Sequence, residues 1–198
     1  ANISKASLTA TLNDNSKIYD GTSYSGGNGI TFNGFVNGET ASLLGGNLVY
    51  SGTSQGAKDA GNYIISGSGL TSNNYNISFV DGKLTINKKD LTISNITANN
   101  KTYDGTTTAT LSNIGSLVGL VTGEDLVLNN PTSVIFSSKD VADGITVTAS
   151  GYTIADKDSF KASNYNLLDT SKTTTANISK ASLTATLNDN SKTYDGTS

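Results

Sequence analysis

The groups that could do chemistry in this 198-residue chain are carboxylates, lysines and hydroxyls, because the sequence contains no His and no Cys. Catalysis would need a Ser–Lys pair, a pair of carboxylates or a metal held by oxygen ligands. Glu39 and Glu124 are the only glutamates. They fall in corresponding loops of two different halves, so we do not expect the roughly 5 to 10 Å separation of a glycosidase pair. The sequence therefore predicts no enzyme, no catalytic residue and no bound cofactor.

Two acidic segments could offer hard oxygen ligands to calcium. One contains Asp156 and Asp158, and the other contains Asp140 and Asp143 followed by Gly144. Neither segment has the ligand spacing of an EF-hand loop, and the nonapeptide glycine-aspartate repeat is also missing. We therefore expect solvated loop carboxylates here and no metal site.

One motif, Lys-x-Tyr-Asp-Gly-Thr, occurs three times along the chain. Its Gly supplies a positive φ, its Asp bonds the local backbone, and its Tyr can anchor a strand end in the core. A motif that recurs in a repeat protein more often marks the scaffold than an active site. The sequence therefore predicts a structural turn at each copy, formed by Tyr19, Asp20, Gly21, Tyr103, Asp104, Gly105, Tyr194, Asp195 and Gly196.

The composition narrows the class of partner. All 13 basic residues are Lys and the formal net charge is -3. The chain thus lacks the planar guanidinium fork that binds phosphates and base edges, and a nucleic-acid backbone would repel it. No stretch approaches the roughly 18 consecutive apolar residues of a membrane-spanning helix. We therefore expect no nucleic-acid partner and no membrane insertion of this segment.

An internal repeat dominates the organisation of the chain. Residues 176–198 repeat residues 1–23 with one difference, Thr193 in place of Ile18. Self-similarity of this kind is the signature of a repeat architecture. The sequence therefore predicts one full period of a near-identical array, followed by the start of the next period, within a longer protein.

Weaker echoes divide the period into two related but diverged domains. The pattern Gly-x-Val-x-Gly-Glu occurs at residues 34–39 and again at 119–124, and the triplet Asn-Tyr-Asn occurs at 74–76 and again at 164–166. Landmarks that keep the same order indicate repeated structural units. The expected division is the end of a preceding repeat at 1–6, a first domain at 7–87, a second domain at 88–178, and the first strand and turn of the next repeat at 179–198.

The local pattern is that of short β-strands. Leu8, Ala10 and Leu12 alternate with threonines, as in a strand with one buried face. An Asp-Gly pair at 81–82 stands between two alternating segments and predicts a β-hairpin. Because no window of twelve residues shows a helical stripe, the expected fold is mostly β with little helix.

The junction between the two domains carries mechanical information. About four polar residues separate the last strand of the first domain from the first strand of the second, with no Gly or Pro among them. A flexible linker would be rich in Gly and Ser. We therefore expect elongated domains in a rod-like array, with one period extending roughly 60 to 80 Å.

The final segment is too short to fold alone. Residues 181–198 hold only one strand and one turn, which cannot bury a core. We expect this tail to be poorly ordered, or ordered only through contact with the preceding domain or with a neighbouring molecule.

The repeated Lys-x-Tyr-Asp-Gly-Thr motif, the Asn-Tyr-Asn-Ile stretch, and the closing strand at 82–86 followed by two lysines resemble the mostly-β-grasp (MBG) and YDG domains of large bacterial adhesins. Residues near 7–87 are similar to the MBG type, and those near 88–178 to the YDG type. The resemblance implies tandem β-grasp-like domains and an extracellular location. In many members it implies an exoprotein resembling filamentous haemagglutinins, exported by two-partner secretion. It supplies no catalytic or ligand residue.

The leading hypothesis is a stalk segment of a bacterial surface or secreted adhesin. Its partners would be neighbouring repeats of the same chain, and other parts of the protein would bind host or bacterial surface glycans or proteins. The alternative is a repeated, weak glycan- or matrix-binding module that acts through multivalency. That alternative depends on Tyr24, Tyr50 and Tyr152, which could stack on sugars if they share an exposed face or could instead pack in cross-strand pairs.

Overall fold

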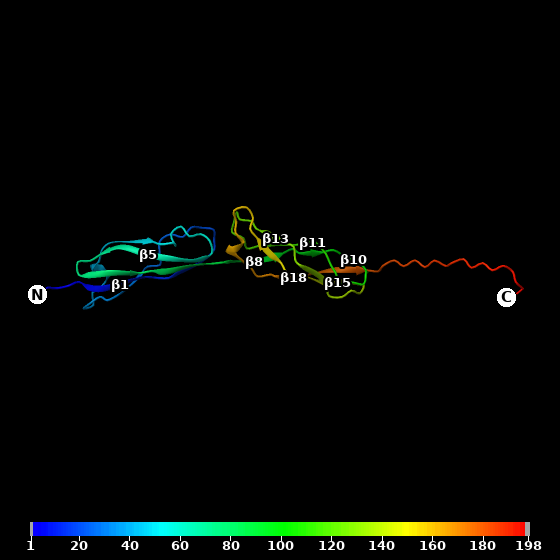
Figure 1. The fold of residues 1–198 in the computed structure, drawn as a ribbon, viewed down its shortest axis with the longest axis horizontal. Coiled ribbons are helices and arrows are strands. Elements are labelled where there is room, and N and C mark those ends of the chain that lie inside the picture. Colours follow the sequence, from blue (N-terminus) through cyan, green and yellow to red (C-terminus); the bar gives the residue numbers. More distant parts are fainter. Residues whose placement is uncertain (1, 197–198) are drawn as a thin grey trace.

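The structure is a computed structural model that describes residues 2–196. Within these residues the chain forms eighteen strands and two single-turn 3-10 helices, so the mostly-β prediction is confirmed. The strands form an elongated body with the two chain ends at opposite poles (Figure 1). No helix in this described part is long and apolar enough to cross a membrane.

The first domain is built from two sheets that follow one another along the long axis. Their strand orders are β3-β1-β6 and β2-β7-β5-β4. The elements are β1 (Ala6–Leu12), β2 (Asn15–Ile18), β3 (Ile30–Asn33), the 3-10 turn η1 (Ala41–Leu43), β4 (Gly45–Ser51), β5 (Gly61–Thr71), β6 (Tyr75–Val80) and β7 (Gly82–Asn87).

Two long arms pass through both sheets of this domain. β1 leads into β2 and β6 leads into β7, and the arms run parallel, with β1 paired to β6 and β2 paired to β7. The predicted Asp81-Gly82 hairpin is therefore wrong. A Cβ on Gly82 would lie 2.5 Å from the Leu12 carbonyl oxygen, so this glycine allows the two arms to approach closely where they change sheets.

The second domain repeats this topology. Its sheets β12-β8-β17 and β10-β18-β15-β14 have the same order and strand directions as those of the first domain, and the pairs β11-β9 and β13-β16 are additional. Its elements are β8 (Lys89–Ser94), β9 (Thr97–Ala98), β10 (Lys101–Thr102), β11 (Leu111–Asn113), β12 (Ser116–Val118), β13 (Val127–Asn129), β14 (Ser133–Phe136), β15 (Ala142–Ser150), β16 (Thr153–Ala155), η2 (Ala162–Asn164), β17 (Tyr165–Leu167) and β18 (Ser171–Ser179).

The hydrophobic core continues from one domain into the other. Leu84 and Ile86 of β7 are buried in the same cluster as Leu91 of β8 and Leu126. Only Lys88 separates the two strands. Two domains that share a core across so short a connection have little freedom to bend against each other.

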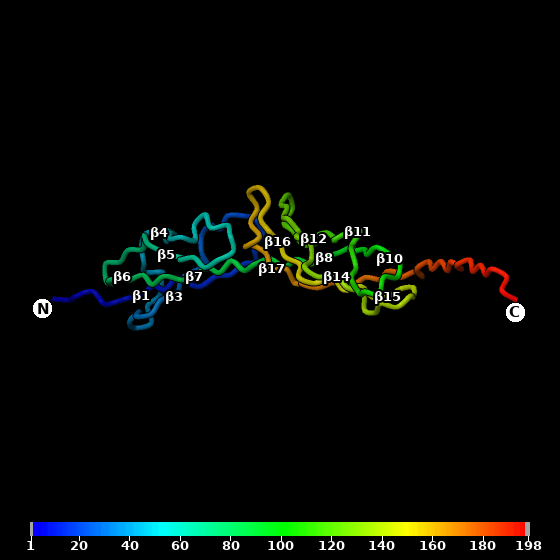
Figure 2. Tube along the Cα trace, turned by 45° about the vertical axis from the view of Figure 1, so that its right-hand side comes forward, coloured from blue at the N-terminus to red at the C-terminus, as the bar shows by residue number. Residues whose placement is uncertain are grey.

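Beyond β18 the chain leaves the second domain as an extended tail (Figure 2). Residues 180–196 form no strand and are exposed. The expectation for this segment also covered residues 197 and 198, which lie outside the described residues. The tail thus has no buried core of its own within the described residues, consistent with a segment that is too short to bury one.

Candidate functional site

The Lys-x-Tyr-Asp-Gly-Thr motif forms a compact turn held by its own side chains. The Asp20 carboxylate accepts a 2.7 Å bond from Lys17 Nζ, a 2.9 Å bond from the Thr22 backbone N–H and a 2.7 Å bond from the Thr22 hydroxyl. Gly21 has a φ of +76°. Because a side chain at that φ is strained, glycine fits the turn.

The second copy of the motif has the same internal geometry. The Asp104 carboxylate accepts bonds from Lys101 Nζ at 2.8 Å and from the Thr106 N–H and hydroxyl at 2.9 Å each. The bond from the lysine is the main reason that the pKa values of Asp20 and Asp104 are both lowered, to about 2. The turn is thus defined by interactions within the motif.

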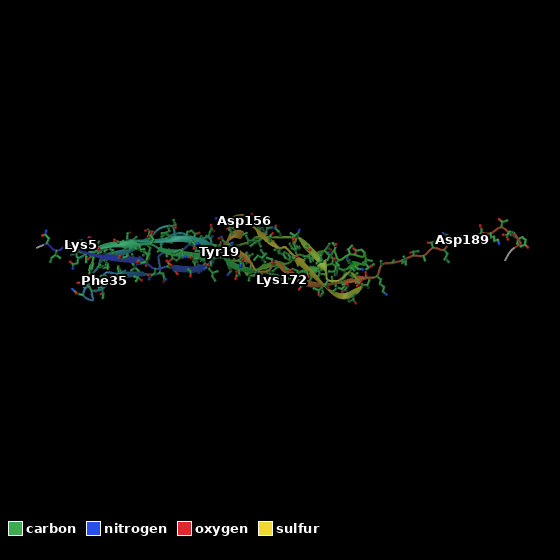
Figure 3. All side chains as sticks on the ribbon, turned by 60° about the horizontal axis from the view of Figure 1, so that its bottom comes forward. Lys5, Tyr19, Phe35, Asp156, Lys172 and Asp189 are labelled. Carbon is green, nitrogen blue, oxygen red and sulfur yellow. The ribbon has the colours of Figure 1, made fainter. Side chains whose placement is uncertain are left out.

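The tyrosine of the first copy points out of its own domain and into the second. The Tyr19 hydroxyl donates to Oε1 of Glu124 at 2.6 Å, and the Tyr165 hydroxyl donates to Oε2 of the same carboxylate at 2.7 Å. The two rings pack edge to face with their centroids 5.4 Å apart. We call Tyr19, Glu124 and Tyr165 the clasp; Figure 3 shows Tyr19 at the middle of the molecule, where the two domains meet.

Burial and the shared carboxylate shape the electrostatics of the clasp. Both tyrosine side chains are almost fully buried. Burial is the first cause of the raised pKa of Tyr165, about 12, and the bond to Glu124 is the second. The same two causes, in the same order, raise the pKa of Tyr19. Both hydroxyls therefore stay protonated near neutral pH and act as donors to the Glu124 carboxylate.

A second set of polar contacts, the latch, lies beside the clasp. The Asp59 carboxylate of the first domain accepts bonds from Lys161 Nζ at 2.5 Å and from Asn164 Nδ2 at 2.9 Å, and Asn164 Oδ1 accepts the backbone N–H of Ala60 at 2.8 Å. Asn164 is buried, and the bond from Lys161 is the first cause of the lowered pKa of Asp59. The latch therefore fixes the rotation of one domain against the other.

The glycine of the motif also contributes to the fit. A Cβ on Gly21 would lie 3.1 Å from Cγ1 of Val121 and 3.2 Å from Oε1 of Glu124. Both distances are shorter than ordinary van der Waals contact. The turn therefore rests directly on the second domain, in addition to the contact made by Tyr19.

The three predicted turns differ in what their tyrosines contact. Tyr19 is 3% exposed, Tyr103 is 38% exposed and Tyr194, in the tail, is 91% exposed. All three glycines have a positive φ. The positive φ thus recurs in all three copies, but the structure places only the first tyrosine in a contact between domains. This tyrosine is not buried in the core of its own domain alone.

The residues that complete the clasp and the latch were not predicted as a site. Glu124 was considered only as a catalytic carboxylate and as a landmark shared by the two domains, and Tyr165 and Asn164 were only landmarks of this kind. Asp59 follows Lys58, as Asp140 follows Lys139 in the second domain. Glu39 and Glu124 lie in different domains, each bonded to a tyrosine. The available signal was the recurrence, in the same order in both domains, of the Gly-x-Val-x-Gly-Glu pattern and the Asn-Tyr-Asn triplet.

The other sequence candidates take no part in this contact. No group of three or more carboxylates with metal-site geometry occurs within residues 2–196. Asp156 accepts the backbone N–H of Ala162 at 2.8 Å. Tyr152 is 2% exposed, so it cannot stack on a sugar. The hydroxyls of Tyr24 and Tyr50 accept hydrogen bonds from other residues of the first domain.

Family profiles match the two halves of the chain in tandem. The profile described as MBG domain (YGX type) matches residues 8–85, and the profile described as YDG domain matches residues 87–176. No curated protein matches this sequence significantly. The boundary between the two matched regions falls at the strand junction that the clasp closes. The predicted tandem is thus confirmed: in this chain a match to the MBG domain of the YGX type is followed by a match to the YDG domain.

Proposed function

We propose that this chain is a load-bearing spacer in the stalk of a bacterial surface or secreted adhesin, and that it has no catalytic role. MBG and YDG domains are found in large repeat-containing surface proteins. The observation that carries the proposal is the junction of the two domains, where β7 leads into β8 through one residue and the clasp and the latch join the flanking loops. Such a junction resists bending.

The repeat extends this argument along the array. Residues 176–196 repeat residues 1–21 with a single difference, so in the array β18 would lead into a further first domain as β7 leads into β8. Chain entry and exit at opposite poles then give a rod whose length increases with each period (Figure 1). A rod of this kind would hold a distal binding region outside the cell, away from its surface.

Small-angle X-ray scattering of chains with one, two and three 175-residue periods tests the proposal. We expect the maximum dimension to increase by a constant step of roughly 60 to 80 Å per period. A step that shrinks with each added period would contradict the spacer role, because the domains would then fold back on each other. That outcome would favour a compact, multivalent binding surface.

A further inference from the structure

The first domain carries its own copy of the clasp carboxylate and its tyrosine, at the N-terminal pole. The Tyr75 hydroxyl donates to Oε2 of Glu39 and accepts the backbone N–H of Val36 at 3.1 Å. In the second domain, the Tyr165 hydroxyl likewise donates to Glu124 and accepts a backbone N–H at 3.1 Å. The two domains therefore build the same receptor for a tyrosine hydroxyl.

The two receptors differ in the second carboxylate oxygen. Oε1 of Glu124 accepts the Tyr19 hydroxyl, whereas Oε1 of Glu39 accepts no hydrogen bond from any residue in 2–196. Beside Glu39 lies a cavity of about 340 Å³, which we call the N-terminal pocket. The residues that define it here are Ile3, Lys5, Val36, Glu39, Asn74 and Tyr75. At the other receptor, Tyr19 packs its ring against Tyr165 and donates its hydroxyl to the second oxygen of Glu124.

The opposite pole of the molecule presents a matching tyrosine. Tyr103 is 38% exposed, and a Cβ on Gly105 would meet nothing within 4 Å. At the junction between the first and second domains, which we call the closed junction, a Cβ on the corresponding Gly21 would lie 3.1 Å from Cγ1 of Val121. The Tyr103 turn thus has the geometry of the Tyr19 turn without a surface to rest on.

Strand register places this tyrosine relative to a following domain. The Tyr19 N–H donates to the Asn87 carbonyl at 2.8 Å, and two residues later Lys89 pairs with Tyr165. The Tyr103 N–H donates to the Ser179 carbonyl, also at 2.8 Å. Two residues after Ser179 comes Ala181, which repeats Ala6 in sequence, and Ala6 pairs with Tyr75.

A following first domain that paired its strands in this way would therefore have the same register, residue for residue, as the closed junction. We propose that the N-terminal pocket binds the Tyr103 turn of another copy of this chain joined in tandem, with the Tyr103 hydroxyl donating to the second oxygen of Glu39. This proposal rests on the stalk function and specifies how consecutive periods are joined. Every junction of the array then contains a tyrosine, a glutamate and a second tyrosine.

The exposure of Ile3 supports this assignment. Ile3 is 99% exposed and borders the pocket. By sequence it corresponds to Ile86 and Ile178, which are 2% and 1% exposed in the last strands of the two domains. An isoleucine at this position is therefore buried when it lies in the last strand of a folded domain. Docking of such a pole on the N-terminal pocket would remove Ile3 from water.

The latch is only partly repeated at this second junction. Asp140 takes the place of Asp59 in the strand register, and Asn74 takes the place of Asn164. Thr71 stands where the second domain has Lys161. The ion pair of the latch is thus absent from the proposed junction, so that junction depends more heavily on its tyrosine.

A chain of two periods, residues 1–175 followed by residues 1–196, tests the proposal. Nitroxide labels on Thr107→Cys of the first period and Asn76→Cys of the second span the proposed junction, and the chain has no native cysteine to interfere. Labels on Ser23→Cys and Asn166→Cys of one period span the closed junction at matching positions. We expect pulsed electron paramagnetic resonance to give one narrow distance peak for each pair, at the same mean distance.

Substitution of Tyr103 shows whether its side chain, and not the covalent linkage of the two periods alone, holds the proposed junction. Tyr103→Ala in the first period should abolish the narrow Thr107–Asn76 peak and leave the Ser23–Asn166 peak intact, while Tyr50→Phe, away from both poles, should change neither. A broad Thr107–Asn76 distribution in the parent chain, or a narrow one that survives Tyr103→Ala, would overturn the proposal. If the scattering step per period persists in that case, the proposed docking of the Tyr103 turn fails and the spacer role stands. If the step is also lost, both fail.

Discussion

The turns at Tyr19 and Tyr103 share one motif and one internal geometry but lie in different surroundings. In both turns, the aspartate carboxylate accepts hydrogen bonds from the lysine ammonium and from the N–H and hydroxyl of the threonine, at 2.7 to 2.9 Å. Yet Tyr19 is 3% exposed and Tyr103 is 38% exposed. The difference teaches that the turn is encoded locally, whereas the role of its tyrosine depends on the domain that follows.

The tail extends this comparison to a third copy that has no domain around it. There Lys192 Nζ lies 2.9 Å from the Asp195 carboxylate, and Gly196 has a φ of +81°. The ion pair and the positive φ of the motif therefore occur in a segment without strand pairing. A motif that is prepared before its partner domain arrives loses less conformational entropy on docking.

The largest expected effect comes from removing the shared acceptor. Glu124→Gln leaves two buried tyrosine hydroxyls with one carbonyl oxygen between them, and should lower the free energy of unfolding by about 2 kcal/mol. Glu39→Gln affects a single hydroxyl and is the matched control, with a smaller expected loss. Urea unfolding followed by circular dichroism measures both. Equal losses would show that the closed junction contributes nothing beyond one bond to tyrosine.

The glycines of the two turns give a second, smaller contrast. Gly21→Ala and Gly105→Ala place a side chain at φ values of +76° and +77°, which costs each variant roughly 1 kcal/mol of backbone strain. Only at Gly21 does the new Cβ also press on Val121, at 3.1 Å, which should add on the order of 1 kcal/mol. Thermal unfolding of the two variants isolates the contact. Identical stability losses would mean that the junction yields to a methyl group.

The sequence predicted the mostly-β fold and the turn motif because both depend on neighbouring residues. Alternation along β1 and the positive φ of Gly21 are properties of short segments. The clasp depends on a bond between residues 105 positions apart, and no local pattern encodes such a contact. The same limit explains the incorrect hairpin, since Asp-Gly between two strands cannot show that each strand pairs with a distant arm. Recurrence of Glu124 and Tyr165 as Glu39 and Tyr75 was the one available clue.

The main cause of the raised tyrosine pKa differs between the two receptors. The pKa of Tyr165 is raised to about 12 mainly by burial, while the bond to Glu39 is the main cause of the raised pKa of Tyr75. Glu39→Gln should thus remove most of the Tyr75 shift, and Glu124→Gln only part of the Tyr165 shift. Carbon-13 NMR of the ring Cζ atoms against pH measures both.

The sign of the linked stability change follows from the raised pKa. Because the folded state favours the neutral phenol, the stabilisation from Tyr165 is complete below pH 10 and is lost as the pH rises through about 12. Unfolding at increasing pH should therefore begin in this window. If Glu124→Gln returned the pKa of Tyr165 fully to 10, burial would not be the main cause and the contrast with Tyr75 would fail.

The smallest expected effect is the absence of any difference in pKa between Asp20 and Asp104, the aspartates of the two turns. Asp20 and Asp104 both have a pKa lowered to about 2, chiefly through the lysine three residues before. A lowered folded-state pKa stabilises the turn above pH 3.8, and this contribution is lost as the pH falls through about 2. Carboxyl-carbon NMR should give matching titration curves for the two residues. A clearly higher pKa at Asp104 would mean that docking, and not the motif, holds the turn, and the Tyr103 turn would then not be prepared in advance for a following domain.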